Sequence, residues 1–341
     1  MATASTTYTD LFAHDEVILD TLQAEYTTQL NALTSGIIMP ISDAMASNSS
    51  GTMLAAPMWD ELDYTQATQI LSTSDALSPG VEGELTTLIP YVNYQQSWGI
   101  DYLARAFSSK DNLTEVVRQI ARWAANITTY NGAQSAQGAF ATALASTHEY
   151  QGAGTLNVSD AIEARKKIGD KQQQLTIAML HSYVSAGALN DGIINTLSNS
   201  VGATELYRAG SLGRFLGMDV FENDVFSAAT AGLYPSYFAA PGALIAHTKE
   251  VAKSSQSVGF LNNLNAGNVK VQVEQARTLE RGGTDAIIAR ITVACGVQGT
   301  AWGSTANPTF SALATGSNWS KVTGWADKNI KIVRSTNQVN S

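Results

Sequence analysis

The chain has 341 residues, of which 44% are hydrophobic and only 14% are charged, whereas about 25% charged residues are usual in soluble domains. Its single cysteine cannot form an internal disulfide, so nothing indicates an oxidising compartment. The net charge of −9 argues against a protein that grips nucleic acid through its phosphates. The first residues lack the basic and apolar regions of a signal peptide, and no apolar run is long enough to span a membrane.

Charge is unevenly distributed along the chain. The first 104 residues hold 13 acidic residues and no Lys or Arg, so they carry −13. The remaining residues, with 20 basic and 16 acidic side chains, carry +4. We therefore expect the acidic N-terminal part to contact the mildly basic body, either within one chain or between chains.

The first predicted element is an amphipathic helix from about Asp15 to Leu33, where apolar residues recur at helical spacing. Gly36 is its expected C-cap, and Pro40 prevents the helix from continuing.

Residues 50–98 have the pattern of a long β-excursion. The β-prone runs Thr52–Ala56, Ala67–Ser72 and Leu85–Val92 are separated by polar residues, and Pro79-Gly80 marks a turn. Two arms of about 20 residues would reach on the order of 60 Å. Because an isolated ribbon is marginally stable in water, this hairpin is predicted to lie on another surface.

The segment from Asp111 to about Ala145 is predicted to be one long helix. A single apolar stripe runs along it, and Asn112 with Glu115 has the spacing of a capping box. About 35 residues would form a rod of roughly 50 Å, whereas a compact globule of this length has a radius of gyration of only about 20 Å. We therefore interpret the helix as a spine. The alternative is two helices broken near Asn131-Gly132.

The rest of the chain alternates between short helices and strands. Its clearest signal is Asn268–Val297, which alternates strongly on both sides of Gly282-Gly283 and is predicted to be a β-hairpin. The other expected elements are helices at Val158–Ile168 (opened by Ser159 or Asp160) and Ala188–Leu197, strands at Leu175–Tyr183, Phe215–Phe221, Ala243–His247 and Asn329–Arg334, and a glycine-rich turn at Gly210–Gly217.

Motifs for catalysis and cofactor binding are absent from the sequence. It contains no P-loop, no GxSxG elbow, no HExxH and no Cys/His spacing for zinc. We therefore expect no enzyme, no cofactor and no metal. The rival hypothesis is a soluble ligand-binding or enzymatic domain with a site built from His181, Asp224 and Glu274, although His181 at the end of an apolar run favours a satisfied core residue.

The predicted hairpin carries charges of both signs. Glu274, Glu280 and Asp285 could supply paired carboxylates, but they alternate with Arg277 and Arg281. Ion pairing between strands or between subunits is the favoured interpretation.

Several segments follow one another in a characteristic order. They are Gly51–Gly80 with its small residues, Pro, Trp and acidic residues; Trp98–Phe107 leading into the spine; Ile162–Ser182 with IGD and MLHS; Gly217–Asp224; Val273–Asp285 with Gly299–Trp302; and Asn307–Thr309, Asn318-Trp319 and Lys328–Ile330. Over nearly the whole chain, this order resembles the major capsid proteins of tailed bacteriophages, whose Hong Kong 97-like fold is also used by encapsulin shells.

The resemblance implies an α+β phage major capsid fold with a long spine helix, an extended β-loop, and peripheral and axial domains. The implied divisions are 1–49 for the N-terminal arm, 50–98 for the extended loop, 99–149 for the peripheral domain with the spine, 150–267 for the axial domain, 268–306 for the peripheral β-strands and 307–341 for a C-terminal segment returning to the axial domain.

The resemblance also implies a function and partners. The chain would assemble as hexamers and pentamers into an icosahedral shell that encloses the double-stranded DNA of a tailed phage, first as a precursor in the host bacterial cytoplasm and finally in the virion. A separate scaffolding protein, a portal and a cement or decoration protein are the implied partners, with no membrane. The alternative within the fold is an encapsulin-type compartment shell with protein cargo.

In such a lattice we expect the extended loop to lie over a neighbour's spine and the acidic arm to pair with basic residues of adjacent subunits. The residues assigned to subunit contacts are Met58, Trp59 and Leu62 in the loop, Arg118, Arg122, Lys270 and Arg277 opposite the arm, and Glu274, Glu280 and Arg281 on the hairpin.

Overall fold

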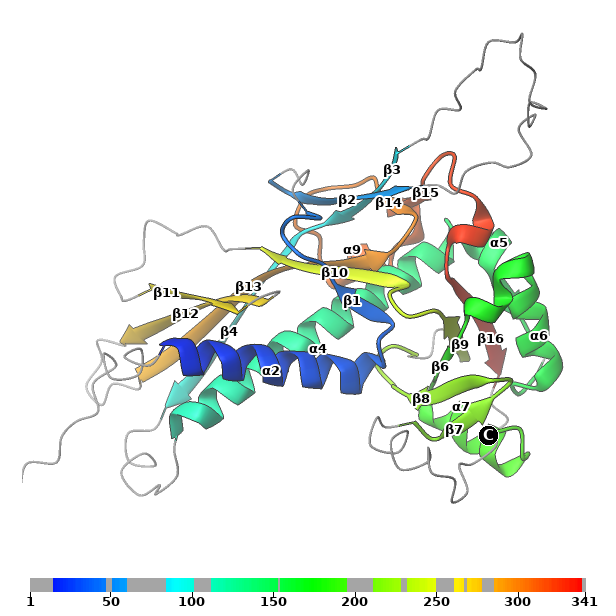
Figure 1. Ribbon diagram of the computed structural model, residues 1–341, viewed down its shortest axis with the longest axis horizontal. Helices are drawn as coiled ribbons and strands as arrows, with labels where there is room; N and C mark the ends of the chain where they lie inside the picture. Colours follow the sequence, from blue (N-terminus) through cyan, green and yellow to red (C-terminus); the bar gives the residue numbers. More distant parts are fainter. Residues whose placement is uncertain are drawn as a thin grey trace, which may run out of the picture.

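The computed structural model describes residues 15–46, 51–59, 84–100, 112–152, 154–194, 211–227, 232–249, 261–266, 269–277 and 285–338. Two long helices run side by side, and three sheets are arranged around them (Figure 1).

The spine is the helix α4, which runs without interruption from Asn112 to Ala141. Its 30 residues correspond to about 45 Å, so the prediction of one long helix is confirmed and the break near Asn131-Gly132 is wrong. A Cβ atom on Gly132 would lie 2.9 Å from both Cys295 Sγ and Ile38 Cδ1. This glycine therefore lets a sheet approach the helix closely rather than ending it.

The predicted N-terminal helix is confirmed as α2, Asp15–Thr34, which lies along α4 (Figure 1). Leu22, Tyr26 and Leu30 are fully buried between the two helices and the first sheet. Ser35 and Gly36 both have positive φ angles, which end the helix and turn the chain into the sheet.

The first sheet is built around β13, Asp285–Val297. This strand pairs with β12 (Val269–Arg277) in the predicted antiparallel hairpin, from Val271↔Ile291 to Arg277↔Asp285, while the turn Gly282-Gly283 lies outside the described residues. It also pairs with β10 and β4. The remaining strands of this sheet are β1 (Ile38–Pro40), β4 (Val92–Ile100), β10 (Leu244–Lys249) and β11 (Leu261–Ala266).

The second sheet has four strands in the order β15 (Trp319–Lys321), β14 (Thr300–Trp302), β3 (Glu84–Pro90) and β2 (Met53–Trp59). The antiparallel pair β2–β3 forms the base of the predicted excursion. The runs Thr52–Ala56 and Leu85–Val92 therefore lie on strands, whereas Ala67–Ser72 and Pro79-Gly80 lie outside the described residues.

The third sheet lies at the other end of the spine (Figure 1). Its order is β5 (Glu149–Gln151), β16 (Ile332–Gln338), β9 (Leu233–Ala239), β6 (Ile177–Leu180), β8 (Met218–Glu222) and β7 (Gly213–Phe215). Two helices, α6 (Val158–Lys166) and α7 (Ser182–Asn190), contribute apolar residues to one core with this sheet.

Two expected strands are present in this sheet with different bounds. The run Leu175–Tyr183 leaves the sheet at Leu180, because the His181 side chain caps a helix that begins at Ser182. Of the helix expected at Ala188–Leu197, only the first three residues are helical, as the end of α7; residues 191–194 are not helical, and residues 195–197 lie outside the described residues. The run Phe215–Phe221, with the glycine-rich turn before it, is a hairpin in which Leu216 (φ 50°) and Gly217 (φ 82°) form the two-residue turn between β7 and β8.

Smaller corrections concern element ends. The N-cap of α6 is Asn157, whose side chain accepts a hydrogen bond from the Asp160 backbone, rather than Ser159 or Asp160. The strand expected at Asn329–Arg334 begins only at Ile332, because Asp327–Asn329 forms a 3₁₀ helix (η3).

The sheets cut across the sequence divisions implied by the resemblance. Strands β10 and β11 belong to the first sheet with β12 and β13, so the division at 267/268 falls between strands of one sheet, which also includes β1 and β4 from earlier in the chain. The C-terminal segment packs on the spine and returns to the third sheet as β16. It also contains α9 (Phe310–Ala314) and η2 (Gly316–Asn318), while α5 (Ala145–His148) leads into β5 and η1 (Gly169–Gln174) connects α6 to β6. Within the described ranges, no helix combines the length and apolarity needed to span a membrane.

Candidate functional site

The acidic N-terminal part meets the body at a junction of four segments. Asp43, in the turn after β1, accepts hydrogen bonds from Lys270 Nζ at 2.7 Å to each carboxylate oxygen. His247 Nε2, on β10, is 2.9 Å from Asp43 Oδ1, and His247 Nδ1 is 2.8 Å from the Tyr91 hydroxyl. Because a carboxylate only accepts, Nε2 donates to Asp43 and Nδ1 accepts from Tyr91.

Electrostatics at this junction keep Asp43 ionised and His247 neutral near pH 7. The hydrogen bond from Lys270 lowers the pKa of Asp43, and burial lowers the pKa of His247. The His247 side chain is 7% exposed, whereas that of Asp43 is 64% exposed. The junction therefore fastens the chain after β1 onto the first sheet, beside the buried apolar residues Ile41 and Ile245.

A second contact joins the acidic part to the spine. Arg122 Nε lies 3.3 Å from Glu25 Oε1, and the Tyr26 hydroxyl lies 3.2 Å from Thr128 Oγ1. The exposed ion pair adds only about 0–1 kcal/mol. The contact between acidic arm and basic body that the charge distribution predicts thus occurs within one chain. Arg122 and Lys270, which the lattice interpretation assigns to subunit contacts, pair inside the subunit.

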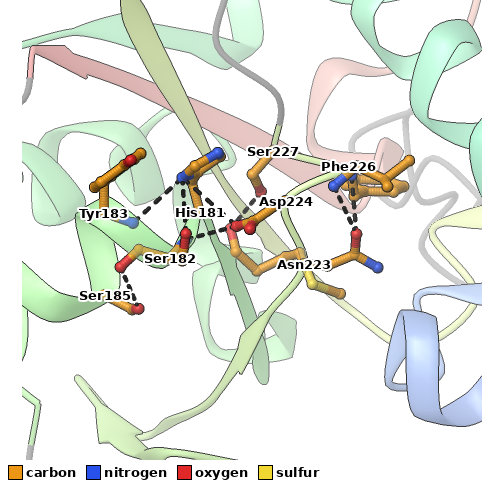
Figure 2. A network of polar contacts seen from close by, with 10 residues as sticks. His181, Ser182, Tyr183, Ser185, Asn223, Asp224, Phe226 and Ser227 are labelled. Carbon is orange, nitrogen blue, oxygen red and sulfur yellow. Dashed lines mark hydrogen bonds and ion pairs between the residues drawn. The ribbon is translucent and has the colours of Figure 1, made fainter.

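A polar network lies at the carboxyl ends of β6 and β8, which are parallel and therefore end together (Figure 2). Asp224 Oδ1 accepts from the Ser182 backbone at 2.8 Å, and this bond lowers the pKa of Asp224. His181 Nδ1 accepts from the Tyr183 backbone at 3.2 Å. Both side chains therefore bind backbone N–H groups in the first turn of α7.

The turn after β8 is held in a similar way. Asn223 Oδ1 accepts from the backbones of Val225 and Phe226, each at 3.0 Å, and Ser227 Oγ donates to the Met179 carbonyl at 3.3 Å (Figure 2). The polar side chains of this turn therefore hold the backbone of the turn and of β6 in place through hydrogen bonds.

The geometry of Ser182, His181 and Asp224 differs from that of a catalytic triad. Ser182 Oγ is 3.4 Å and Asp224 Oδ1 is 3.5 Å from the same ring nitrogen, Nδ1 of His181. A triad histidine uses opposite nitrogens for the nucleophile and the carboxylate. Glu274, the third residue of the rival enzyme hypothesis, lies on β12 in the first sheet. That hypothetical site is therefore not assembled, and no metal-binding group of His, Cys, Asp or Glu occurs among the described residues.

The remaining predicted contact residues are scattered. Met58 is half-buried in its own chain, where its sulfur accepts from Gln298 Nε2 at 2.7 Å, and Arg118 is exposed on α4. In the register of β12 and β13, Glu274 lies opposite Ile288 and Arg277 lies opposite Asp285. Trp59 is the last residue of β2, and the structure describes its backbone but not its side chain. Leu62, Glu280 and Arg281 lie outside the described residues.

Sequence reasoning missed two features. Asp43 and His247 are 204 positions apart, so no local signal joins them. The second feature is an open groove of about 420 Å³ on the spine, which is lined chiefly by Trp123, Ile127, Thr129, Tyr130, Val225 and Phe310. Trp123, Ile127 and Tyr130 recur at helical spacing on α4 and widen its apolar face, which could have indicated this groove.

No protein-family model and no curated protein match this sequence. Solved structures do match it. The capsid of Ralstonia phage GP4 is 10% identical, with 90% of this chain and 90% of that chain covered and a TM-score of 0.53. The head structure of Helicobacter pylori bacteriophage KHP40 is 8% identical over 89% of this chain and 86% of that chain, with a TM-score of 0.51.

The capsid of a native GTA particle is 11% identical over 90% of both chains, again with a TM-score of 0.51. The chain therefore has the fold of these capsid structures, and the predicted α+β capsid fold is confirmed.

Proposed function

We propose that this chain is a major capsid protein that assembles into the shell of a tailed bacteriophage. The observation that carries the proposal is the likeness of fold over 90% of the chain to the capsids of Ralstonia phage GP4 and of the GTA particle. At identities of 10% and 11%, this likeness lies in the arrangement of elements and not in the sequence.

The architecture supports a mechanical role. A spine of 30 residues joins the first and third sheets, and β2 and β3 form an antiparallel pair in the second sheet (Figure 1). An uninterrupted helix of this length gives a subunit a long surface for contacts with several neighbours. The polar networks with catalytic residue types instead cap a helix or fasten a turn, which supports a non-enzymatic protein.

Contacts between subunits would depend mainly on apolar burial. Exposed ion pairs contribute about 0–1 kcal/mol each, whereas buried apolar surface contributes about 25 cal/mol per Å². Arg118, which is exposed, and Arg277 remain candidates for pairing with acidic residues of a neighbour. The extended loop with Trp59 and Leu62 would lie over an adjacent subunit.

The partners follow from the same proposal. The chain would form hexamers and pentamers, assemble with a separate scaffolding protein and a portal in the host cytoplasm, and accept a decoration protein on the mature virion. Its net charge of −9 would keep the inner wall from binding the enclosed DNA tightly. Within the part of the chain described here, no observation favours an encapsulin-type compartment or a soluble enzyme.

The proposal is tested by the mass of the purified full-length chain in solution. Size-exclusion chromatography with light scattering should show hexamers, pentamers or closed shells beside the 36.1 kDa subunit. The run should be repeated at low and high salt, because ion pairs at subunit contacts weaken with ionic strength. A monomer at all concentrations and salts, also after addition of a scaffold-containing phage lysate, would contradict the proposal.

A further inference from the structure

The groove on the spine has a preformed apolar wall. Tyr130 and Phe310 pack edge to face with ring centroids 4.5 Å apart, and Tyr94 stacks on the other side of Phe310 at 5.0 Å. Tyr130 is nevertheless 38% exposed, and Val225, from the turn after β8, is 45% exposed. These rings are held in place by one another and still present apolar surface to solvent, which is the usual make-up of a docking site.

One polar atom in the groove has no partner. Thr129 is 2% exposed, and its Oγ1 makes no hydrogen bond in the structure. Leaving a buried hydroxyl without a hydrogen bond carries a free-energy penalty. An occupant that presents a backbone N–H or C=O here would remove this penalty, so the groove suits a peptide segment.

The charge of the groove narrows the choice of occupant. None of the residues that line it is charged. Residues 60–83 contain five acidic and no basic side chains, and burying carboxylates without partners is unfavourable. Residues 1–14 contain one acidic residue, Asp10, and the apolar side chains Tyr8, Leu11 and Phe12. The N-terminal segment is therefore the better match.

The N-terminal segment is also long enough to reach the groove. It leaves α2 at Asp15, which is 11 positions before Tyr26, or about 16 Å along the helix. The Tyr26 hydroxyl contacts Thr128, which directly precedes Thr129 on α4. Fourteen extended residues span up to about 46 Å, and a helix with side chains is only about 10–12 Å wide.

We infer that residues 1–14 of this chain dock in the groove, with Leu11 and Phe12 against Trp123, Tyr130 and Val225 and with a backbone group bonded to Thr129 Oγ1. The inference concerns the folded chain and does not rest on the proposed shell function. It gives the groove residues of the spine, Trp123, Ile127 and Tyr130, a specific partner.

Disulfide trapping tests this docking in the full-length protein. The pair Phe12→Cys and Val225→Cys is oxidised under mild conditions, while the native Cys295 is fully buried and stays out of the reaction. The matched control is Phe12→Cys with Val158→Cys, because Val158 on α6 is 41% exposed. We expect at least ten times more disulfide in the first pair, and equal yields would overturn the inference. Gel mobility shows whether the segment occupies the groove of its own subunit or of another copy.

Thiol labelling gives a second readout that needs no cross-link. Val225→Cys should react with a maleimide at least three times faster when Leu11→Asp and Phe12→Asp are added, because the charged segment would leave the groove. Val158→Cys should react at the same rate in both backgrounds. An unchanged rate at position 225 would overturn the inference. Neither readout requires closed shells, so a failure here is distinguishable from a failure of the capsid proposal.

Discussion

The carbonyl oxygen of Leu313 approaches the backbone of Gly138 so closely that a Cβ atom on this glycine would lie 2.0 Å from it. The same Cβ would lie 2.6 Å from Nε1 of Trp319, which itself donates a hydrogen bond to the Leu313 carbonyl. The C-terminal segment is thus seated directly on the spine, and only glycine allows this approach.

We predict that Gly138→Ala destabilises the subunit by about 3 kcal/mol, because backbone would have to move to admit the methyl group. Gly132→Ala should cost less, since the atoms it would meet are the ends of the Cys295 and Ile38 side chains. Urea unfolding of the unassembled chain measures both values.

Gly187→Ala is the matched control for these variants. Gly187 lies within α7, and a Cβ there would meet nothing within 4 Å. Replacing a helical glycine by alanine should stabilise the protein by about 0.5–1 kcal/mol. Equal effects of alanine at positions 138 and 187 would contradict the close approach.

Acid should weaken the junction around His247. Burial lowers the pKa of His247 below its usual 6.5, so the unfolded state binds a proton more readily than the folded state. The contribution of His247 to the free energy of unfolding is therefore fully present above pH 6.5. It is lost as the pH falls from 6.5 through the lowered pKa of the folded state. Asp43, whose pKa is lowered below 3.8, acts in the same direction at lower pH, with a small effect because its carboxylate is exposed.

His247→Gln should flatten this pH dependence. The amide of Gln can donate to Asp43 and accept from Tyr91 without a titratable group. We expect the urea midpoint of the native chain to fall between pH 7.5 and pH 5 and that of the variant to fall less. The residual slope belongs to His148, whose pKa is also lowered by burial. Identical slopes for the two proteins would show that His247 does not control the junction.

Arg334 ties the last strand to the end of the spine. It makes hydrogen bonds of 3.1 and 2.8 Å to the two carboxylate oxygens of Glu149, and its guanidinium lies 4.9 Å from the centre of the Phe140 ring. Arg334→Met should destabilise by about 3 kcal/mol, because the carboxylate of Glu149, which is only 19% exposed, would lose its charged partner and keep only the hydrogen bond from Thr336. Arg334→Lys should lose less, since lysine keeps the charge but not the two-pronged geometry.

The exposed pair Arg214–Asp219 is the control for Arg334, because the Arg214 side chain is 57% exposed. Arg214→Met should change stability by less than about 1 kcal/mol. Thermal unfolding of the variants gives the comparison. A loss at Arg214 as large as that at Arg334 would argue against the role of burial.

Local sequence patterns predicted the long elements well. The helical spacing of apolar residues marked α2 and α4, and strict alternation marked the β12–β13 hairpin. The helical signal is clear in α2 because Leu22, Tyr26 and Leu30 are buried on one face, whereas β13 is buried on both faces from Ile291 to Val297.

Short elements depended on single residues that the patterns did not resolve. An apolar run continued past Leu180 in the sequence, but the His181 side chain started a helix. Another run hid a turn at Leu216, a non-glycine residue with a positive φ angle of 50°. Such residues adopt this conformation rarely, so propensity argues against them.

Contacts between distant segments were not predictable from the sequence alone. The parallel pairing of β1 with β10 and the bond between Asp43 and His247 join positions about 200 residues apart. The charge imbalance did predict that the acidic part contacts the body, and Arg122 and Lys270 were among the basic residues named, but it could not identify Glu25 and Asp43 as their partners within the same chain.

Imaging of the assembled chain tests the capsid proposal most directly. The purified full-length protein, alone and mixed with a scaffold-containing phage lysate, would be examined by electron microscopy of negatively stained and frozen samples. The proposal predicts closed icosahedral shells whose density accommodates the spine, the three sheets and loops that cross onto neighbouring subunits. Dispersed 36.1 kDa monomers under both conditions would contradict it.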